Sequence, residues 1–216
     1  MANAITLGRV FALFVVIRLL YVGSASVIAI CALVLAVIIA LDGLDGYVAR
    51  KRHETGQFGA IIDIVGDRIV ENALWVVFAD LDLIPVWVPL LVMSRSFLVD
   101  GLRSASYSDG MTPFGDHNMM RSPLTRFLTA GRFMRGLFGG AKALGFVFLA
   151  GLHAWQQPDA GSTWTAALYG GDGFRMVGWT MVWLAVVLSV VRAIPVVADS
   201  IAYLREKDAC ENPLPA

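Results

Sequence analysis

The stretch DGLDGYVARKRHETGQFGAIIDIVGD, residues 42–67, places four aspartates where two long apolar segments meet, at Asp42, Asp45, Asp63 and Asp67. An aspartate in the middle of a membrane-spanning helix costs about 2.5–3.5 kcal/mol to insert. At about 100° per residue, the first two aspartates share one helix face and the last two share another. Because a short polar turn joins the two segments, we expect the four carboxylates to converge at one depth.

The rest of the chain is strongly apolar, which predicts an integral membrane protein. Of its 216 residues, 57% are hydrophobic and 16% are charged, and the mean hydropathy is +0.69, far from the balance of a soluble domain. The net charge is zero, so the chain lacks the basic field typical of nucleic-acid-binding proteins. Two cysteines, Cys31 and Cys210, are too few for a disulfide framework.

Six apolar windows are long enough to cross the hydrocarbon core, which takes about 20 residues. They cover residues 7–23, 26–50, 57–80, 85–107, 133–155 and 174–203. We therefore predict an all-α polytopic membrane protein with six transmembrane helices, whose first window is retained rather than cleaved as a signal peptide. Lys and Arg concentrate on one side, which predicts cytoplasmic termini and a multi-pass protein of the cell membrane. Residues 1–205 are expected to form one catalytic domain and residues 206–216 a short polar tail.

Neighbouring carboxylates repel one another unless protons or cations offset their charge. Mg²⁺ and Mn²⁺ are the simplest candidates, because hard cations prefer carboxylate oxygens. Two divalent cations shared by the four aspartates would clamp a diphosphate and stabilise its leaving oxygen. Gly46, Ala49 and Gly59 leave space for a nucleotide beside the helices, and Arg50 is placed to pair with phosphate. The alternative is that the small residues serve only helix packing.

The stretch resembles the signature of the CDP-alcohol phosphotransferase family, D-x2-D-G-x2-A-R-x8-G-x3-D-x3-D. All eight fixed positions match with unbroken spacing, and they are Asp42, Asp45, Gly46, Ala49, Arg50, Gly59, Asp63 and Asp67. The resemblance covers 26 residues and is highly specific. The family's six-helix core also resembles the predicted arrangement of this chain.

The resemblance implies a role for each matched residue. Asp42, Asp45 and Asp63 would hold metal, and Asp67 would both contact metal and act as the general base. The CDP moiety would lie against the positions of Asp42, Asp45, Gly46, Ala49, Arg50 and Gly59. The implied reaction is displacement at the β-phosphorus of a CDP-linked donor by an acceptor hydroxyl, with release of CMP. A homodimer is implied by the resemblance alone.

The identity of the acceptor depends on cations in the second half of the chain. Arg95, Arg103, Arg135 and Lys142 lie within predicted helices, where cations are costly. Together they would form a pocket for an anionic acceptor such as glycerol 3-phosphate. The segments RSFLVDGLR (95–103) and GGAKALG (139–145) resemble degenerate forms of segments in phosphatidylglycerophosphate synthases. Alternatively, one of these cations neutralises Asp100 or the aspartate cluster.

We therefore predict a membrane enzyme of phospholipid biosynthesis that transfers a phosphatidyl group from CDP-diacylglycerol to an acceptor alcohol, with glycerol 3-phosphate favoured. Another acceptor, such as serine or inositol phosphate, and a soluble CDP-alcohol donor stay open. A polytopic prenyltransferase also presents aspartates to a magnesium-bound diphosphate, but its motifs differ in order. A non-enzymatic ion carrier would use intramembrane carboxylates too, without explaining the accompanying glycines, alanine and arginine.

The sequence also supports predictions for several residues outside the signature. Glu71 lies one helical turn after Asp67, and either supports a metal ligand from behind or pairs with Arg68 or another buried cation. His153 is expected to be interfacial or structural. Six tryptophans, including Trp75, Trp87, Trp155 and Trp164, are predicted to be anchors at the membrane interface.

Overall fold

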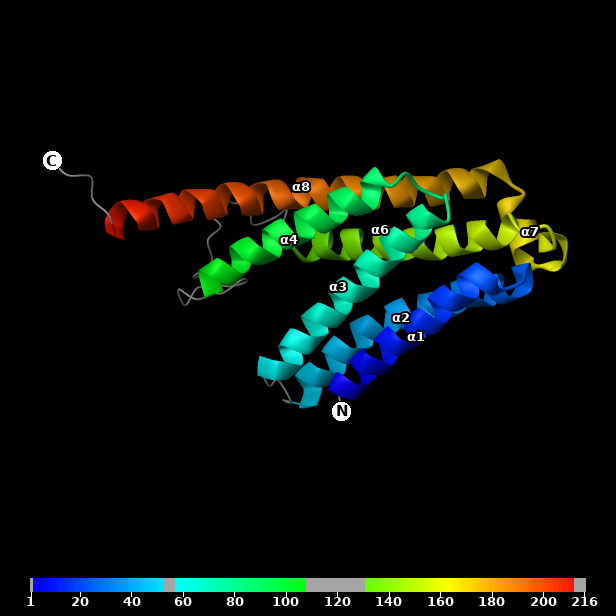
Figure 1. Cartoon of the computed structure of the whole chain (residues 1–216), viewed down its shortest axis with the longest axis horizontal. Helices are drawn as coiled ribbons and strands as arrows, with labels where there is room; N and C mark the ends of the chain where they lie inside the picture. Colours follow the sequence, from blue (N-terminus) through cyan, green and yellow to red (C-terminus); the bar gives the residue numbers. More distant parts are fainter. Residues whose placement is uncertain (1, 53–56, 108–130, 212–216) are drawn as a thin grey trace. The chain divides into compact units, whose positions relative to one another are not determined.

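The computed structural model describes residues 2–52, 57–107 and 131–211. Inside the helices, the side chains of residues 2–5, 42–52, 57, 58, 60, 63, 103–107, 132 and 202–211 lie outside the described part. The described elements are helices without any strand: α1 Ala2–Val22, α2 Ala25–Arg52, α3 Gln57–Asp80, α4 Trp87–Tyr107, α6 Arg132–Trp155, the 3-10 helix η1 Ala160–Ser162, α7 Trp164–Tyr169 and α8 Asp172–Glu211 (Figure 1). The predicted all-α class is confirmed.

The predicted windows correspond to the six long helices. For α2, α3, α4 and α6 the observed ends lie within two residues of the predicted ones. Two helices extend beyond their apolar windows: α1 begins at Ala2, and α8 continues to Glu211. The extensions are polar or small segments that hydropathy alone does not mark, and the residues 204–207 of α8, LREK, are all good helix formers.

Two helices of the described part are long and apolar enough to cross a membrane, Phe133–Trp155 and Asp172–Ile201, and Ala25–Leu41 is a shorter apolar helix. Several apolar side chains on α1 and α2 are also more than half exposed, including Phe11 at 72% and Ile30 at 58%. With the mean hydropathy of +0.69, these features indicate a membrane protein. Six crossings and cytoplasmic termini stay predictions.

The chain divides into two compact units, residues 1–89 with 141–183, and residues 90–140 with 184–216. The boundaries between the units fall inside α4, α6 and α8. The single catalytic domain over residues 1–205 stays a prediction. In the second unit, Val99 of α4 packs with Ala193 and Val196 of α8, and Phe138 of α6 packs with Leu188 of α8.

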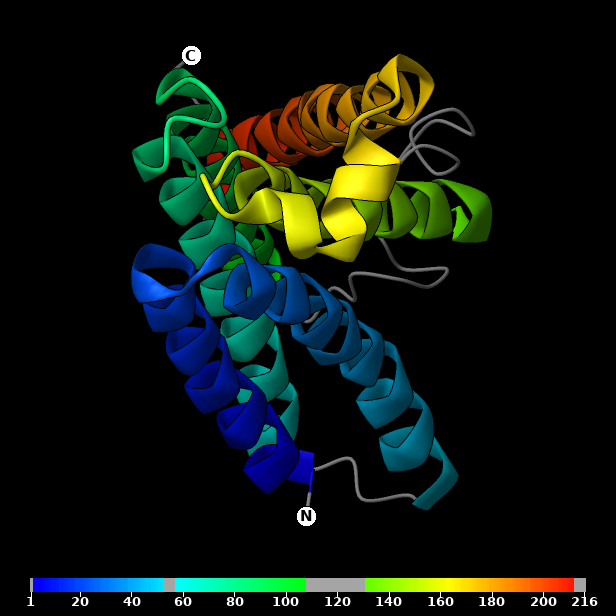
Figure 2. The same ribbon diagram turned by 90° about the vertical axis from the view of Figure 1, so that its right-hand side faces the viewer.

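The first unit is built on three helices that follow one another in the chain. Helices α1 and α2 form an antiparallel pair, and α1 also packs against α3 (Figure 2). Helix α1 ends just before Gly23, whose N–H donates to Leu19 O at 2.8 Å. The N-terminus of α2 is satisfied from far along the chain, because both carboxylate oxygens of Asp159 accept the Ala25 N–H at 3.2 Å. This contact supplies an acceptor for an N–H group at the start of α2, where N–H groups lack intrahelical partners.

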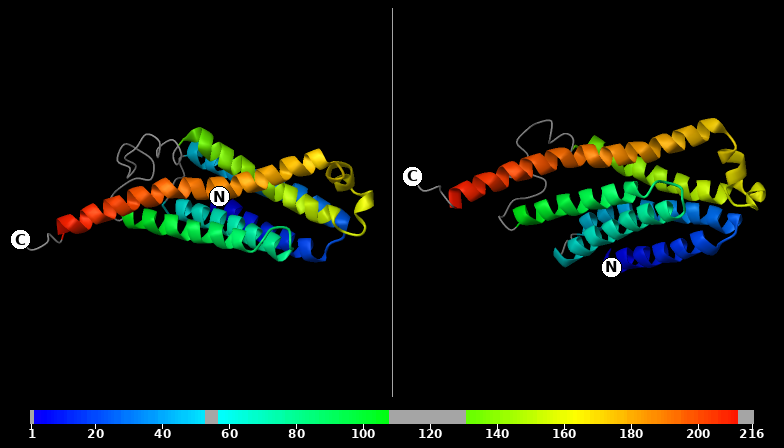
Figure 3. Two further views of the ribbon diagram at one scale, coloured as in Figure 1. Left: turned by 90° about the horizontal axis from the view of Figure 1, so that it is seen from above. Right: turned by 45° about the horizontal axis from the view of Figure 1, so that its top comes forward.

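The chain leaves α6, turns through η1 and α7, and returns in α8 (Figure 3). Aromatic side chains of these elements pack together. Tyr169 is 2% exposed, stacks on Phe148 at 5.5 Å, and donates its hydroxyl to Phe148 O at 3.0 Å. Phe174 meets Tyr169 edge to face at 4.9 Å. Burial raises the pKa of the Tyr169 hydroxyl, so the ring keeps its proton and its role as a donor.

The packing of α8 against α6 depends on Gly178 of α8, which lies against the Phe148 ring. A Cβ on Gly178 would overlap that ring, so Gly178→Ala should lower the free energy of unfolding by about 1–3 kcal/mol. The measurement is thermal or denaturant unfolding in detergent. Gly173→Ala is the matched control on the same helix, because its Cβ would meet no atom within 4 Å. Equal stability of the two variants would contradict this packing.

The contacts of His153 and Trp75 test the predictions made for these two side chains. One imidazole nitrogen of His153 lies 3.0 Å from Leu20 O, which ties α6 to α1 and supports the structural interpretation. Trp75 is 2% exposed and meets Phe146 edge to face at 4.8 Å, so the prediction that it anchors an interface is wrong. Trp75 was assigned to the interface because it lies near the end of an apolar window, but the face of α3 on which it lies packs inward. The interface role of the other tryptophans stays a prediction.

Candidate active site

Four helices of the first unit line a pocket. Asp67 and Glu71 enter it from α3, one helical turn apart and therefore on the same face. Helix α1 contributes Arg9 and α6 contributes Lys142. The described residues that line it are Arg9, Ile39, Asp67, Val70, Glu71, Lys142, Ala143 and Phe146. One residue of the predicted signature, Asp67, therefore lines the pocket together with one residue of the predicted acceptor set, Lys142.

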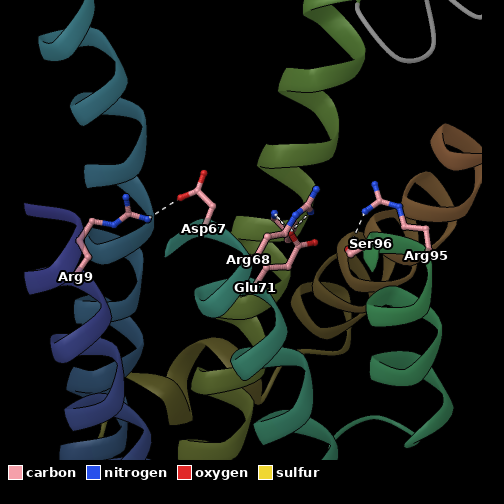
Figure 4. Close-up of polar contacts among 7 residues, drawn as sticks. Arg9, Asp67, Arg68, Glu71, Arg95 and Ser96 are labelled. Atoms are coloured by element: carbon pink, nitrogen blue, oxygen red, sulfur yellow. Dashed lines mark hydrogen bonds and ion pairs between the residues drawn. The ribbon is translucent and has the colours of Figure 1, made fainter. Parts of the chain in front are cut away.

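Asp67 is held from α1. The Arg9 guanidinium donates from Nη2 to Asp67 Oδ1 at 3.3 Å (Figure 4). The Arg9 side chain is 4% exposed and the Asp67 side chain 44%. The carboxylate therefore has a buried cation behind it while part of its surface stays accessible, as a group that is to meet a substrate requires.

Glu71 forms the second ion pair of the pocket. Its Oε2 accepts a hydrogen bond from Lys142 Nζ at 2.9 Å and lies 3.5 Å from Arg68 Nη1 on the preceding turn of α3. Glu71 is 5% exposed, against 23% for Lys142 and 28% for Arg68. Of the two interpretations of Glu71, pairing with Arg68 and a further buried cation is the one that the contacts support. Among its described lining residues, the pocket thus has two carboxylates, Asp67 and Glu71, and two cations, Arg9 and Lys142.

The remaining signature residues lie at the adjoining ends of α2 and α3. Asp42, Asp45, Gly46, Ala49 and Arg50 belong to the last turns of α2, and Asp63 to α3, one turn before Asp67, but their side chains are outside the described part. Gly59 is half-buried in the first turn of α3. Ile39, three residues before Asp42, lines the same pocket as Asp67. Helix α2 therefore reaches the pocket one turn ahead of its first aspartate, while the convergence of the four carboxylates stays a prediction.

The donor set fits a hard divalent cation. The predicted ligands are the carboxylates of Asp42, Asp45, Asp63 and Asp67, the type of donor that such a cation prefers, and Asp67 lines the pocket. Among the side chains that the structure describes, no three of His, Cys, Asp or Glu form a cluster. Asp42, Asp45 and Asp63 fall outside that set, so metal binding stays a prediction for the signature as a whole.

The other predicted acceptor residues belong to the second unit. Arg95 of α4 donates from Nη1 to Ser96 Oγ at 3.2 Å, and its guanidinium carbon lies 5.8 Å from the centre of the Phe138 ring. Arg135 is exposed on α6, and the side chain of Arg103 is outside the described part. Arg192 of α8 also lies over the Phe138 ring, at 5.1 Å.

Arg9 and Arg192 were not among the predicted site residues. Both are arginines inside strongly apolar helices, the feature that had singled out Arg95. The same rule, applied to the first and last windows, would have found them. Which carboxylate or ring each one contacts is information that only the fold supplies.

The described residues define an all-helical membrane protein with a pocket in which two carboxylates of α3 pair with cations of α1 and α6. The family model described as CDP-alcohol phosphatidyltransferase matches residues 1–191. The chain belongs to the CDP-alcohol phosphatidyltransferase family, as the resemblance of residues 42–67 had predicted.

Curated relatives share about a third of the aligned residues. A CDP-diacylglycerol--glycerol-3-phosphate 3-phosphatidyltransferase of Bacillus subtilis (strain 168) is 35% identical over 113 residues, which are 47% of this chain and 58% of the relative. A protein of the same name from Rickettsia bellii (strain RML369-C) is 33% identical over 104 residues, 47% of this chain and 56% of the relative. A probable phosphatidylglycerophosphate synthase of Mycobacterium tuberculosis (strain ATCC 25618 / H37Rv) is 30% identical over 118 residues, 52% of this chain and 56% of the relative. The chain thus spans about half the length of the curated relatives it matches.

Proposed function

We propose that the protein transfers a phosphatidyl group from CDP-diacylglycerol to an acceptor alcohol in phospholipid biosynthesis, with release of CMP. The observation that carries this proposal is the unbroken signature over residues 42–67, whose last aspartate lines a pocket. Family membership restricts the chemistry to CDP-linked donors. The names of the relatives favour glycerol 3-phosphate as the acceptor.

The reaction exchanges one phosphorus–oxygen bond for another. The acceptor hydroxyl oxygen forms a bond to the β-phosphorus, the bond from that phosphorus to the oxygen of CMP breaks, and CMP leaves with the bonding electrons. Asp67 accepts the hydroxyl proton, a role that suits a half-exposed carboxylate at a pocket. Two divalent cations, when bound, would supply Lewis-acid stabilisation to the diphosphate and the leaving group. Asp42, Asp45, Asp63 and Asp67 would hold them.

The remaining signature positions would bind the donor. Gly46, Ala49 and Gly59 would allow the CDP moiety to approach the helix backbones, and Arg50 would pair with its phosphate. CDP-diacylglycerol is favoured over a soluble donor, because the diphosphate of a lipid rests at headgroup depth, where the ends of the predicted spans lie.

An anionic acceptor would be bound by cationic side chains. Lys142 is the best supported member of this set, because it lines the pocket that contains Asp67. Glu71 holds the Lys142 ammonium at 2.9 Å, and a phosphate would compete with Glu71 for it. Arg95, Arg103 and Arg135 are proposed to contribute to acceptor binding.

We further propose a multi-pass protein of the cell membrane that acts as a homodimer with its active site facing the cytoplasm.

Acceptor-dependent turnover tests this proposal. Purified protein in detergent is given CDP-diacylglycerol, Mg²⁺ or Mn²⁺, and in separate reactions glycerol 3-phosphate, serine, inositol, inositol phosphate or phosphatidylglycerol. We expect CMP release with glycerol 3-phosphate and none after EDTA treatment. Turnover with serine and not with glycerol 3-phosphate would overturn the acceptor assignment. Turnover in a further reaction with CDP-choline and diacylglycerol, and in none with CDP-diacylglycerol, would overturn the lipid donor.

A further inference from the structure

Arg9 and Asp67 meet although 58 residues separate them in the chain. Arg9 lies in an apolar helix and its side chain is 4% exposed, while its guanidinium reaches Asp67 Oδ1 at 3.3 Å. Keeping a cation at such a site is costly unless a specific anionic partner compensates for the lost hydration. Asp67 is that partner, and it is also the proposed general base.

The packing of α1 against α3 brings Arg9 within hydrogen-bonding distance of Asp67. Thr6 lies three residues before Arg9, on the same face of α1, and is 4% exposed. A Cβ on Gly66 would lie only 2.5 Å from Thr6 Cγ2, so α1 comes this close because residue 66 has no side chain. Gly66 directly precedes Asp67 in α3. Backbone packing and the ion pair therefore act at the same point of contact.

We propose that Arg9 is the positioning residue of Asp67, an inference that rests on the proposed phosphatidyl transfer. The hydrogen bond to Oδ1 fixes the rotation of the Asp67 carboxylate, so that the base meets the acceptor hydroxyl and the metal in one orientation. Small errors in the placement of a reacting group cost large factors in rate. The planar guanidinium suits this task because its donors are held in a fixed fork, unlike those of the flexible lysine ammonium.

Steady-state kinetics provide the first test. Arg9→Met should lower kcat by about 10- to 100-fold, the usual effect of removing a group that orients a ligand or base, while the KM for CDP-diacylglycerol changes by less than about threefold. Arg9→Lys should recover part of the lost kcat. Arg18→Met is the matched control, because Arg18 is exposed on the same helix, and it should keep the wild-type kcat within about twofold.

Mn²⁺ binding supplies a readout that needs no turnover. Free Mn²⁺ is measured by electron paramagnetic resonance during titration of the wild type, Arg9→Met, Asp67→Asn and the double variant. Each single variant should bind Mn²⁺ about 10-fold more weakly. If Arg9 acts through Asp67, the double variant should bind no more weakly than Asp67→Asn alone. A merely structural role would make the two effects add, and that result would overturn the proposal.

A second pair of variants keeps the inference testable if Arg9→Met does not fold. Gly66→Ala should displace α1 and reproduce the kinetic pattern of Arg9→Met, whereas Gly8→Ala should behave like the wild type, since its Cβ would meet nothing within 4 Å. Wild-type kcat and Mn²⁺ affinity in folded Arg9→Met would overturn the positioning role while phosphatidyl transfer stands. Inactive wild type with coupled Mn²⁺ binding would instead overturn the proposed reaction and support the coupling of Arg9 to Asp67.

Discussion

Asp67→Asn is expected to lower the rate of CMP release by about 10²- to 10⁴-fold, the range in which positioned general bases contribute. The amide keeps the shape of the side chain and can still accept the Arg9 hydrogen bond at 3.3 Å, but it cannot take the proton of the acceptor hydroxyl. The measurement is acceptor-dependent CMP release at saturating donor and metal, with circular dichroism to verify that the variant is folded.

The matched control for this variant is Asp82→Asn. Asp82 is exposed in the turn after α3 and has a positive φ of 57°, which asparagine adopts as readily as aspartate. Its CMP release should equal that of the wild type. If Asp67→Asn retained activity within about twofold of the wild type, Asp67 would not be the base.

Glu71→Leu is expected to lower the free energy of unfolding by about 3 kcal/mol, because it leaves the partly buried cations Lys142 and Arg68 without their shared carboxylate. The measurement is denaturant unfolding in detergent, followed by tryptophan fluorescence. Asp172→Leu is the control, since Asp172 pairs with Arg175 at the surface with its side chain 95% exposed. An exposed pair of this kind contributes at most about 1 kcal/mol.

The double variant Glu71→Leu with Lys142→Met separates lost charge pairing from lost packing. Replacing both partners of a buried pair by apolar side chains is often close to neutral. The double variant should therefore be more stable than Glu71→Leu alone. A double variant that is less stable than either single variant would show that the ion pair is not the reason for the loss.

The helices were predictable because each apolar window is bounded by polar residues, glycine or proline. The helix ends at Gln57 and Asp80 coincide with the predicted window. Helical spacing also predicted that Asp67 and Glu71 share a face. These are local properties, fixed by the 3.6-residue period and by the cost of placing polar groups in hydrocarbon.

The partners of those carboxylates were not predictable. Arg9 reaches Asp67 across 58 residues and Lys142 reaches Glu71 across 71, and no periodicity within one helix encodes such pairings. The Asp159 carboxylate that receives the Ala25 N–H is 134 residues away. Trp75 was assigned to the interface because its position in the sequence lies near a window end, although the packing of α3 turns it inward against Phe146.

The phosphatidyl-transfer reaction is tested most directly by the stoichiometry of its products. CDP-diacylglycerol, glycerol 3-phosphate and Mg²⁺ are incubated with purified wild-type protein, and both CMP and the new lipid phosphodiester are quantified by mass spectrometry. We predict equal amounts of the two products, none without glycerol 3-phosphate and none with EDTA. CMP that forms at the same rate without any acceptor, or folded and metal-supplied protein that forms no CMP with any CDP-linked donor, would contradict the proposed reaction.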